Sequence, residues 1–369
     1  MIRVLFLIPT LDRSGAEKQL ALLASGLPRD EFEVEVIALT RSGPYAEELA
    51  RHGVTVTVIS KRWKFDPFAY WRLQRLLAER RPDILHTWLF AANAYGRLVV
   101  GKATSPQVIV SERCVDCWKQ SWQLWLDRKL IARTTHMIGN SQAVAKFYAD
   151  LGVPLARLSV IRNGIEPLPT PTRTRAAVLE ELGIPANAKV VLSVGRLASQ
   201  KRVADLLWGF HLLRNLNDDD VHFIIVGDGP ERASLERFAE KLSVREFVRF
   251  TGHRADVRDM LAAADLFWLA SEFEGQSNSL MEAMSAGLPV VVSDIEPNRE
   301  LVEHEVTGLI VPTSDRPAYA RAAQRLLTDG ELSARLGSAA EQRMRQDFSV
   351  ERMIAEHAAL YRSVVSVER

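Results

Sequence analysis

The chain has 369 residues, about twice the usual length of a single domain, so two domains are expected. Lys and Arg number 47 and Asp and Glu 46, and this balance gives no reason to expect nucleic acid as a partner. The first apolar run is broken by Pro9 and followed by charged residues, unlike a secretion signal. No uninterrupted apolar stretch reaches the roughly 18 residues of a membrane-spanning helix, so a cytoplasmic protein is expected.

The first half of the chain alternates between apolar runs of strand length and amphipathic helical patterns. A helix is expected from about Gly15 to Ala24, where Ser14 and Glu17 fit a capping box. The order strand, helix, strand favours a doubly wound parallel sheet. The expected strands are 2–8, 32–39, 54–59, 82–86, 107–111 and 136–140.

A proline-rich segment, PLPTPTR at 167–173, interrupts this alternation and is interpreted as a linker. A second alternating series follows it. We therefore expect an α/β protein of two Rossmann-like doubly wound domains that face each other across a cleft. The domains are expected at 1–168 and 169–348, with a C-terminal helix at 349–369 that packs back on the first. The expected strands of the second domain are 189–195, 221–227, 248–252, 265–270, 289–293 and 307–312.

Residues at the carboxyl ends of the strands are the candidates for ligand binding, because ligands of open α/β sheets bind there. Arg196 and Lys201 follow the strand that ends at Gly195 and precede a helix, which indicates an anion site or else a solvated basic loop. His86 ends its predicted strand and would project into the cleft, although a lone histidine is more often structural. The turn VGDGPERASL at 226–235 is interpreted as a tight turn rather than an NAD site.

Two candidate metal features are interpreted as structural. Cys114 and Cys117 form a C-x-x-C pair, which occurs in redox pairs and half zinc sites, but no second Cys/His cluster lies near them. Two reduced thiols are therefore expected. The acidic run 218–220 precedes a strand rather than ending one and is expected to be a solvated loop.

Two glutamates flank the start of a predicted helix in the stretch 271–294. Ser279 and Glu282 fit a capping box, and Gly287 would end the helix. Glu274 precedes the helix, where no cap needs it. Eight helical residues would span about 12 Å, too far for a glycosidase pair at roughly 5–9.5 Å. Two acceptors that hold different hydroxyl groups of one extended ligand fit better.

The pattern as a whole resembles the retaining glycosyltransferases of family 4, which have the GT-B fold. The resemblance covers nearly the whole chain, and the two glutamates separated by seven residues are its most specific mark. The segments that carry it are SVGRL with QKR (193–202), VGDGPER (226–232), FTGHRADV (250–257), EFEGQSNSLMEAMSAGLPVVVSD (272–294), NRELV (298–302) and TGLIVP (307–312).

The resemblance implies a role for each matching residue. Arg196 and Lys201 would hold the diphosphate of a nucleotide-sugar, and Glu282 would bind the ribose hydroxyls. Glu274 would contact the sugar hydroxyls, and His86 would touch the sugar or the reacting centre. The remaining donor-binding residues would be Gly15, Gly195, His253, Arg254, Gln276, Ser277, Asn278 and Ser279.

The implied reaction is retaining transfer of a sugar from a UDP- or GDP-linked donor, with no metal and no further cofactor, to a glycan or lipid-linked acceptor. It would serve the assembly of a cell-surface polysaccharide or glycolipid. A sugar-nucleotide epimerase of the same fold and a non-catalytic nucleotide-sugar-binding subunit are the alternatives.

The stretch KRWKFDPFAYWR at 61–72 mixes cations with aromatic residues. It is either an exposed charged face or a patch for peripheral contact with the cytoplasmic face of the membrane. CWKQSWQLWL at 117–126 adds three tryptophans, which could stack on sugars or simply pack.

Overall fold

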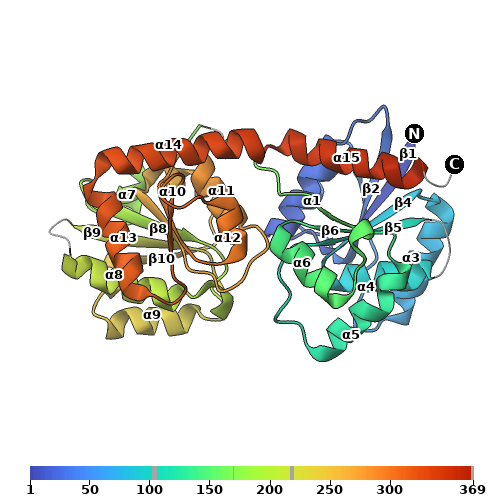
Figure 1. Cartoon of the computed structure of the whole chain (residues 1–369), viewed down its shortest axis with the longest axis horizontal. Helices are drawn as coiled ribbons and strands as arrows, with labels where there is room; N and C mark the ends of the chain where they lie inside the picture. The colour runs from blue at the N-terminus through green and yellow to red at the C-terminus, as the bar shows by residue number, and fades with distance from the viewer. Residues whose placement is uncertain (102–105, 169, 217–219, 367–369) are drawn as a thin grey trace. The chain divides into compact units, whose positions relative to one another are not determined.

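The computed structural model describes residues 1–101, 106–168, 170–216 and 220–366 (Figure 1). The chain divides into two compact units. The first unit joins Met1–Gly164 with Phe348–Arg369, and the second unit is Ile165–Asp347. Part of the acidic run, residues 218–219, lies outside the described residues, so its prediction stays open.

The sheet of the first unit has seven parallel strands in the order β3-β2-β1-β4-β5-β6-β7. The order reverses between β1 and β4, which pair with Val4 opposite Ile84. This reversal is the doubly wound arrangement that the sequence predicts. The strands are β1 (Ile2–Thr10), β2 (Phe32–Arg41), β3 (Thr55–Val58), β4 (Ile84–Trp88), β5 (Gln107–Glu112), β6 (His136–Gly139) and β7 (Leu158–Val160).

Helices cover both faces of this sheet. Figure 1 shows α1 and α15 on one side and α4 and α5 on the other. Alternate strand residues follow the same division, because Val4 and Phe6 pack with α1 and α15 whereas Leu5 and Leu7 pack with α3 and α4. The helices are α1 (Gly15–Gly26), α2 (Pro44–Arg51), α3 (Pro67–Arg80), α4 (Leu89–Val100), α5 (Ser121–Leu130), α6 (Gln142–Leu151) and α15 (Val350–Ser366), with the short 3-10 helices η1 (Ile131–Arg133) and η2 (Leu155–Arg157).

The second unit repeats the design with six parallel strands in the order β10-β9-β8-β11-β12-β13. Five of the six strands are short, mostly buried apolar runs, as expected for a parallel sheet covered on both faces, whereas the edge strand β10 carries Arg249 and Thr251 and is only partly buried. The strands are β8 (Lys189–Val194), β9 (Val221–Val226), β10 (Val248–Gly252), β11 (Leu266–Leu269), β12 (Val290–Ser293) and β13 (Leu309–Val311).

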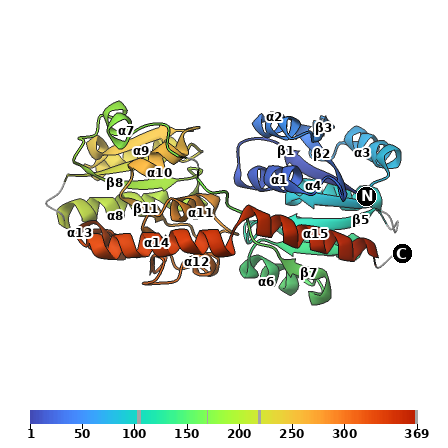
Figure 2. The same ribbon diagram turned by 90° about the horizontal axis from the view of Figure 1, so that it is seen from above.

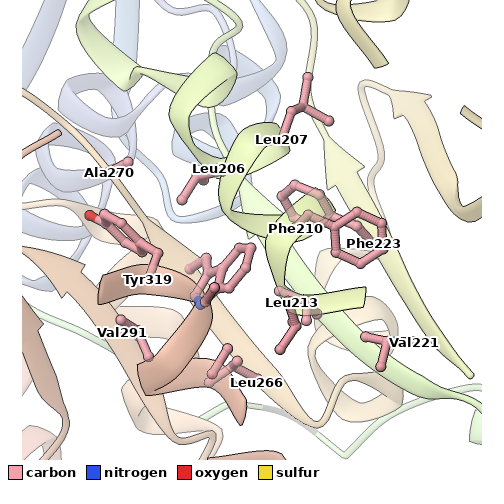
Figure 3. Close-up of a cluster of buried hydrophobic side chains, with 14 of the residues drawn as sticks. Leu206, Leu207, Phe210, Leu213, Val221, Phe223, Leu266, Ala270, Val291 and Tyr319 are labelled. Carbon is pink, nitrogen blue, oxygen red and sulfur yellow. The ribbon is translucent and has the colours of Figure 1, made fainter. Parts of the chain in front are cut away.

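Aromatic packing fills one face of the second sheet. Figure 3 shows Phe210 and Leu213 of α8 beside Phe223 and Val221 of β9. The ring centroids of Phe210 and Phe223 are 5.4 Å apart, in a tilted pair that favours dispersion contacts. The helices are α7 (Arg175–Glu181), α8 (Val203–Leu216), α9 (Arg232–Lys241), α10 (Val257–Ala263), α11 (Asn278–Ser285), α12 (Glu296–Leu301), α13 (Arg316–Thr328) and α14 (Gly330–Asp347), with η3 (Ser199–Lys201) and η4 (Arg245–Phe247).

The C-terminal helix α15 belongs to the first unit and lies beside α1 in Figures 1 and 2. Its Tyr361 is fully buried against the sheet. The chain enters the second unit at Ile165, just before the proline-rich segment. Thr172 of that segment already binds the second unit, because its backbone N–H and its hydroxyl donate to Asp259 at 2.8 and 2.7 Å.

The two predicted capping boxes are wrong. Ser14 is the N-cap of α1, but its hydroxyl donates to the Glu17 carboxylate instead of accepting from the backbone. Ser279 lies inside α11, because the helix begins at Asn278 with Ser277 as its N-cap. Gly287 follows the C-cap with φ of +70°, so the predicted helix stop is confirmed. No helix in the described residues is long and apolar enough to cross a membrane.

Candidate active site

The loops that follow β8 and β11 meet at the carboxyl edge of the second sheet. These two strands are neighbours, with Val191 opposite Leu266, so their following loops emerge side by side. The Gln200 side-chain amide donates to the Phe273 carbonyl at 2.7 Å, and the Glu272 N–H donates to the Gln200 carbonyl at 2.9 Å. These contacts fix the loop that carries Arg196 and Lys201 against the loop that carries Glu274.

Lys201 and Glu274 form an ion pair in this place. Their side chains are 17% and 10% exposed, so the pair is largely shielded but still reaches solvent. Ser271 donates its hydroxyl to the same carboxylate at 2.7 Å. Arg196 is exposed and lines a cavity of about 10 Å³ together with Gly195 and Lys201. The structure therefore gathers three of the four predicted catalytic residues around the two loops.

Close backbone packing holds the ends of β8 and β9 together. Gly227 has φ of +128°, and a Cβ there would lie 2.0 Å from the Gly195 carbonyl oxygen. A Cβ at Gly229 would lie 2.3 Å from the carbonyl oxygen of Leu197. Neither position has room for a Cβ, so close packing of the backbone requires both glycines. This packing confirms the tight turn predicted at 226–235.

The N-terminus of α11 lies between the two glutamates in sequence. Gln276 and Ser277 are buried, and the Ser277 and Ser279 hydroxyls are 3.2 Å apart. Asn278, Ser279 and Glu282 are partly exposed. Because the first N–H groups of a helix and its dipole favour negative charge, this end is suited to an anionic ligand.

His253 and Arg254, which follow β10, lie in different surroundings. Arg254 contacts Asp256 at 2.6 Å and Glu181 at 2.7 Å, and these hydrogen bonds raise the pKa of its guanidinium. That side chain is therefore held by carboxylates of its own unit. His253 is exposed and near Asp228, whose pKa it helps to lower. Of this predicted pair, only His253 presents its side chain openly at the strand end.

Gly15 is the first residue of α1 in the first unit, directly after the loop that follows β1. The nearby Glu17 is buried and accepts a hydrogen bond from the Thr10 hydroxyl at 3.2 Å. Burial raises the pKa of Glu17 despite its hydroxyl donors. This carboxyl thus fixes the start of α1 to the end of β1.

The placement predicted for His86 is wrong. β4 continues to Trp88, so His86 lies inside the strand and is fully buried. Its Nδ1 is 2.6 Å from the Tyr361 hydroxyl and its Nε2 is 2.8 Å from Ser111 Oγ, so both ring nitrogens are engaged. Burial lowers the pKa of His86 well below its usual range, which keeps the ring neutral. The imidazole joins two strands to α15 and has no surface to offer a sugar.

Metal ligands are not clustered in the described part of the chain. No group of three or more His, Cys, Asp or Glu side chains there could hold a metal ion. Cys114 is partly exposed and Cys117 is exposed.

Comparison with known protein families shows which family the chain belongs to. Residues 13–167 match the family model described as Glycosyltransferase Family 4. Residues 175–343 match the model described as Glycosyl transferases group 1. The chain belongs to the family 4 glycosyltransferases.

Relatives of this family 4 glycosyltransferase include enzymes of surface-glycan assembly. The lipopolysaccharide core biosynthesis glycosyltransferase LpsD of Rhizobium meliloti is 29% identical over 337 residues, 91% of each chain. The UDP-Gal:alpha-D-GlcNAc-diphosphoundecaprenol alpha-1,3-galactosyltransferase of Escherichia coli is 27% identical over 83% of each chain. The chain is accordingly an enzyme of the glycosyltransferase class.

Solved structures agree on the fold. HepE of Anabaena in complex with UDP-glucose matches with a TM-score of 0.88 at 23% identity, over 98% of this chain and 100% of that chain. The same protein with UDP and glucose matches with a TM-score of 0.85 at 24% identity, with the same coverage. The predicted GT-B architecture of two Rossmann-like parallel-sheet units is confirmed.

Sequence reasoning missed a set of buried charges after β5 in this family 4 glycosyltransferase. Glu112, Arg113, Asp116 and Lys119 are all buried, and Asp127 of α5 joins them. Lys119 Nζ lies 2.8 Å from Asp116 and 3.0 Å from Asp127, and Tyr148 donates to Asp116 at 2.5 Å. The signal in the sequence is four charged residues within eight positions directly after an apolar strand, where a solvated loop is the ordinary interpretation.

Proposed function

We propose that this enzyme transfers a sugar from a nucleotide-sugar to a glycan or lipid-linked acceptor, with retention of the anomeric configuration. The observation that carries the proposal is the Lys201–Glu274 ion pair beside exposed Arg196, at the carboxyl ends of adjacent strands. Retention rests on membership of family 4. UDP is the proposed nucleotide, because the HepE complexes and the Escherichia coli galactosyltransferase carry UDP or UDP-sugars in their names.

Charge development explains why two cations belong at this strand end. In the transfer, the bond between the anomeric carbon and the diphosphate oxygen breaks, and the acceptor oxygen bonds to that carbon. The acceptor proton leaves with the phosphate oxygen, and the departing nucleoside diphosphate gains negative charge. Arg196 and Lys201 would stabilise that charge more in the transition state than in the bound donor, which lowers the barrier.

The two glutamates would hold different parts of the donor. Glu282, in the first turns of α11, is proposed to accept from the ribose hydroxyls. Glu274 is proposed to accept from sugar hydroxyls while it keeps Lys201 in place. The N-terminus of α11 would face the phosphates, where its dipole favours negative charge.

A metal-independent reaction is part of the proposal, supported by the two cations that can take the place of a divalent ion at the diphosphate. Turnover in the presence of excess EDTA tests it. Undiminished rates are expected, and a rate restored only by added Mg²⁺ or Mn²⁺ would contradict it.

Ligand-induced thermal stabilisation tests donor binding directly. A nucleotide that binds only the folded chain raises its melting temperature. UDP and UDP-sugars should raise it more than GDP and GDP-sugars do, and Lys201→Met should reduce the shift. Lys241→Met, an exposed lysine on α9, is the matched control and should keep it. No shift with any nucleotide would overturn the donor assignment.

Peripheral contact with a membrane surface is proposed for the stretch 61–72 and for α5. Large aromatic side chains are exposed there to an unusual degree, from 44% for Trp122 to 70% for Phe65. Asp66 and Asp127, the acids within these two segments, are both buried, whereas the cations Arg62, Lys64, Arg128 and Lys129 of the same segments are exposed. Aromatic rings with cations suit the headgroup layer of an anionic membrane. The exposed aromatic residues are Trp63, Phe65, Phe68, Trp71, Trp118, Trp122 and Trp125.

Flotation with vesicles of phosphatidylcholine and phosphatidylglycerol tests this contact. Replacing Trp63, Phe65 and Trp71 by Ser should release the enzyme from the vesicles, and high salt should weaken binding by the wild type. Leu155→Ser, at a 77% exposed apolar residue of η2, is the control and should float like the wild type. Equal flotation of the triple variant would contradict the proposal and leave sugar stacking as the role of these rings.

A further inference from the structure

Three cations are buried among the described residues of the first unit, and two of them are matched by carboxylates. Arg97 donates from Nη2 to Asp127 at 2.6 Å. Lys119 lies 2.8 Å from Asp116, 3.0 Å from Asp127 and 3.4 Å from Glu112. This matching is what buried charges require, because a desolvated ion without a counter-charge costs several kcal/mol.

Arg113, the third cation, has no such match. It is 9% exposed, and no carboxylate among the described residues lies within 4.0 Å of its guanidinium. Nη2 donates to the Asn163 side-chain oxygen, and the guanidinium stacks 4.5 Å from the centre of the Trp88 ring. Nη1 has no hydrogen-bond partner. Burial lowers the pKa of Arg113 to about 9, and no neighbouring acid counters that effect.

The surroundings of Arg113 are also free of negative charge. His86 and His357 both feel its charge, which together with burial lowers the pKa of each ring, to about 3 for His357. Both rings are therefore neutral at physiological pH. Glu112 precedes Arg113 in the chain but points to the other face of the sheet, where it contacts Lys119. The positive charge of Arg113 remains uncompensated.

Its place in the fold is where a doubly wound sheet binds ligands. The strand order reverses between β1 and β4, and Trp88 is the last residue of β4. Arg113 directly follows β5, and Asn140 directly follows β6. Asn140 donates to the Arg113 carbonyl at 3.4 Å, while its side-chain oxygen and the Trp88 indole N–H have no partner. Three neighbouring strand ends thus each carry a buried polar atom without a partner.

We propose that Arg113 binds an oxyanion of a substrate, a phosphate or a carboxylate, at the carboxyl edge of the first sheet. The inference rests on the proposed transferase function, because it takes the anion to be part of a sugar donor or acceptor. Nη1 would donate to the anion, and the Trp88 indole N–H lies at the adjacent strand end to complete the contact. The Asn140 side-chain oxygen only accepts hydrogen bonds, so it is not part of the anion contact. The anion supplies the counter-charge that the chain does not.

The experiment uses the full chain and pyrophosphate as the probe, with melting temperature as the readout. Arg196→Met with Lys201→Met removes the proposed diphosphate site of the second unit. Pyrophosphate should still stabilise this double variant against chloride at equal ionic strength. Adding Arg113→Met should raise the pyrophosphate concentration needed by about tenfold or more, the usual effect of losing a hydrogen bond to a charged group. An unchanged concentration would overturn the proposal.

Two further variants separate a binding arginine from a structural one. Without anion, Arg113→Met should melt at or above the wild-type temperature, because it removes an uncompensated buried charge. Arg97→Met, which removes one of the two cations that contact buried Asp127, should melt well below it. Arg113→Lys keeps the charge and should retain most of the pyrophosphate response. A melting temperature lowered in Arg113→Met as far as in Arg97→Met would assign Arg113 to structure alone.

UDP distinguishes the two sources of the anion. If Arg113→Met alone weakens stabilisation by UDP, the diphosphate of the donor reaches Arg113. If UDP is unaffected while the pyrophosphate response of the double variant depends on Arg113, the acceptor supplies the anion. Both results support the site. Failure of the wild type to respond to any nucleotide would instead count against the proposed donor site, and the pyrophosphate comparison would still test Arg113.

Discussion

The two units share a parallel sheet with helices on both faces, yet they hold their carboxyl edges together by different forces. In the first unit, buried ions fix the loop after β5, with Lys119 in contact with three carboxylates. In the second unit, backbone packing fixes the loops after β8 and β9, with Gly227 and Gly229 against the carbonyls of Gly195 and Leu197.

This difference between the two edges distinguishes charges that hold the fold together from charges that can bind a ligand. Because glycine contacts hold the second edge, its cations are not needed to fix the loops. Lys201 therefore stays 17% exposed, and Arg196 is exposed. In the first unit the buried cations Arg97 and Lys119 are paired with carboxylates inside the fold. Arg113 is the buried cation of the described residues that has no carboxylate partner. Each prediction below tests one side of this contrast.

Lys119→Met should have the largest effect on stability. It leaves Glu112, Asp116 and Asp127 buried without their shared cation, which should lower the free energy of unfolding by about 3–5 kcal/mol. Urea unfolding followed by circular dichroism measures the change. Lys146→Met, an exposed lysine of α6, should change it by less than about 0.5 kcal/mol. Equal effects of the two variants would contradict the role of buried ions at this edge.

Lys201→Met should instead lower turnover while the fold survives. Loss of a preorganised positive group at the leaving diphosphate should reduce the rate by about 10²–10³-fold. The free energy of unfolding should change by only about 1 kcal/mol, because the ion pair between Lys201 and Glu274 that the substitution removes is partly solvated. Nucleotide release is measured with the sugar-nucleotide that gives the largest thermal shift. A rate near that of the wild type would remove Lys201 from the reaction.

Gly227→Ala tests the backbone packing of the second edge. The added Cβ would meet the Gly195 carbonyl oxygen at 2.0 Å, so the loops must move apart. A loss of about 2 kcal/mol or more in the free energy of unfolding is expected from overpacking and the positive φ together. Gly183→Ala, with φ of +61° and nothing within 4 Å, measures the φ cost alone at about 1 kcal/mol. Equal losses in both would show that the close contact is unimportant.

The pH dependence of stability should reveal the buried ions by a smaller effect. Burial raises the pKa of Glu112 from its usual 4.5 to about 7. The folded chain therefore binds a proton that the unfolded chain has lost, so this group stabilises the fold increasingly as pH falls from 8 to 6, by about 1 kcal/mol. Urea unfolding at both values, with Glu112→Gln for comparison, measures it. The variant should lack this part of the pH dependence, and an identical slope in both chains would contradict the raised pKa.

The strands of both sheets were largely predictable, because a parallel sheet buried on two faces requires short apolar runs. Each of the 12 predicted runs overlaps an observed strand. β7 was missed, since its three residues, Leu158–Val160, are only partly buried and give too short a pattern. The Ser14 box failed because sequence spacing does not determine the partner of a hydroxyl, and the Ser279 box failed because α11 begins two residues earlier than the box requires.

The candidate site was predictable only where residues sit at true strand ends. Lys201 and Glu274 follow neighbouring strands and meet, as their positions suggested. His86 failed because β4 runs on through Thr87 and Trp88, so two residues decided whether a ring faces solvent or the core. Arg113 could not be found from sequence, since what marks it is the lack of a carboxylate partner that Arg97 and Lys119 both have.

The first unit is discontinuous in the chain, because α15 completes its core with Tyr361 against Phe32 and His86. During synthesis the second unit, all of it encoded by one continuous stretch, can therefore finish folding before the unit that precedes it. Until α15 is made, α1 covers only part of that face of the N-terminal sheet, and Phe32 and His86 lack their contacts with Tyr361. We therefore expect the second unit to complete its core before the first, although the first unit begins earlier in the chain.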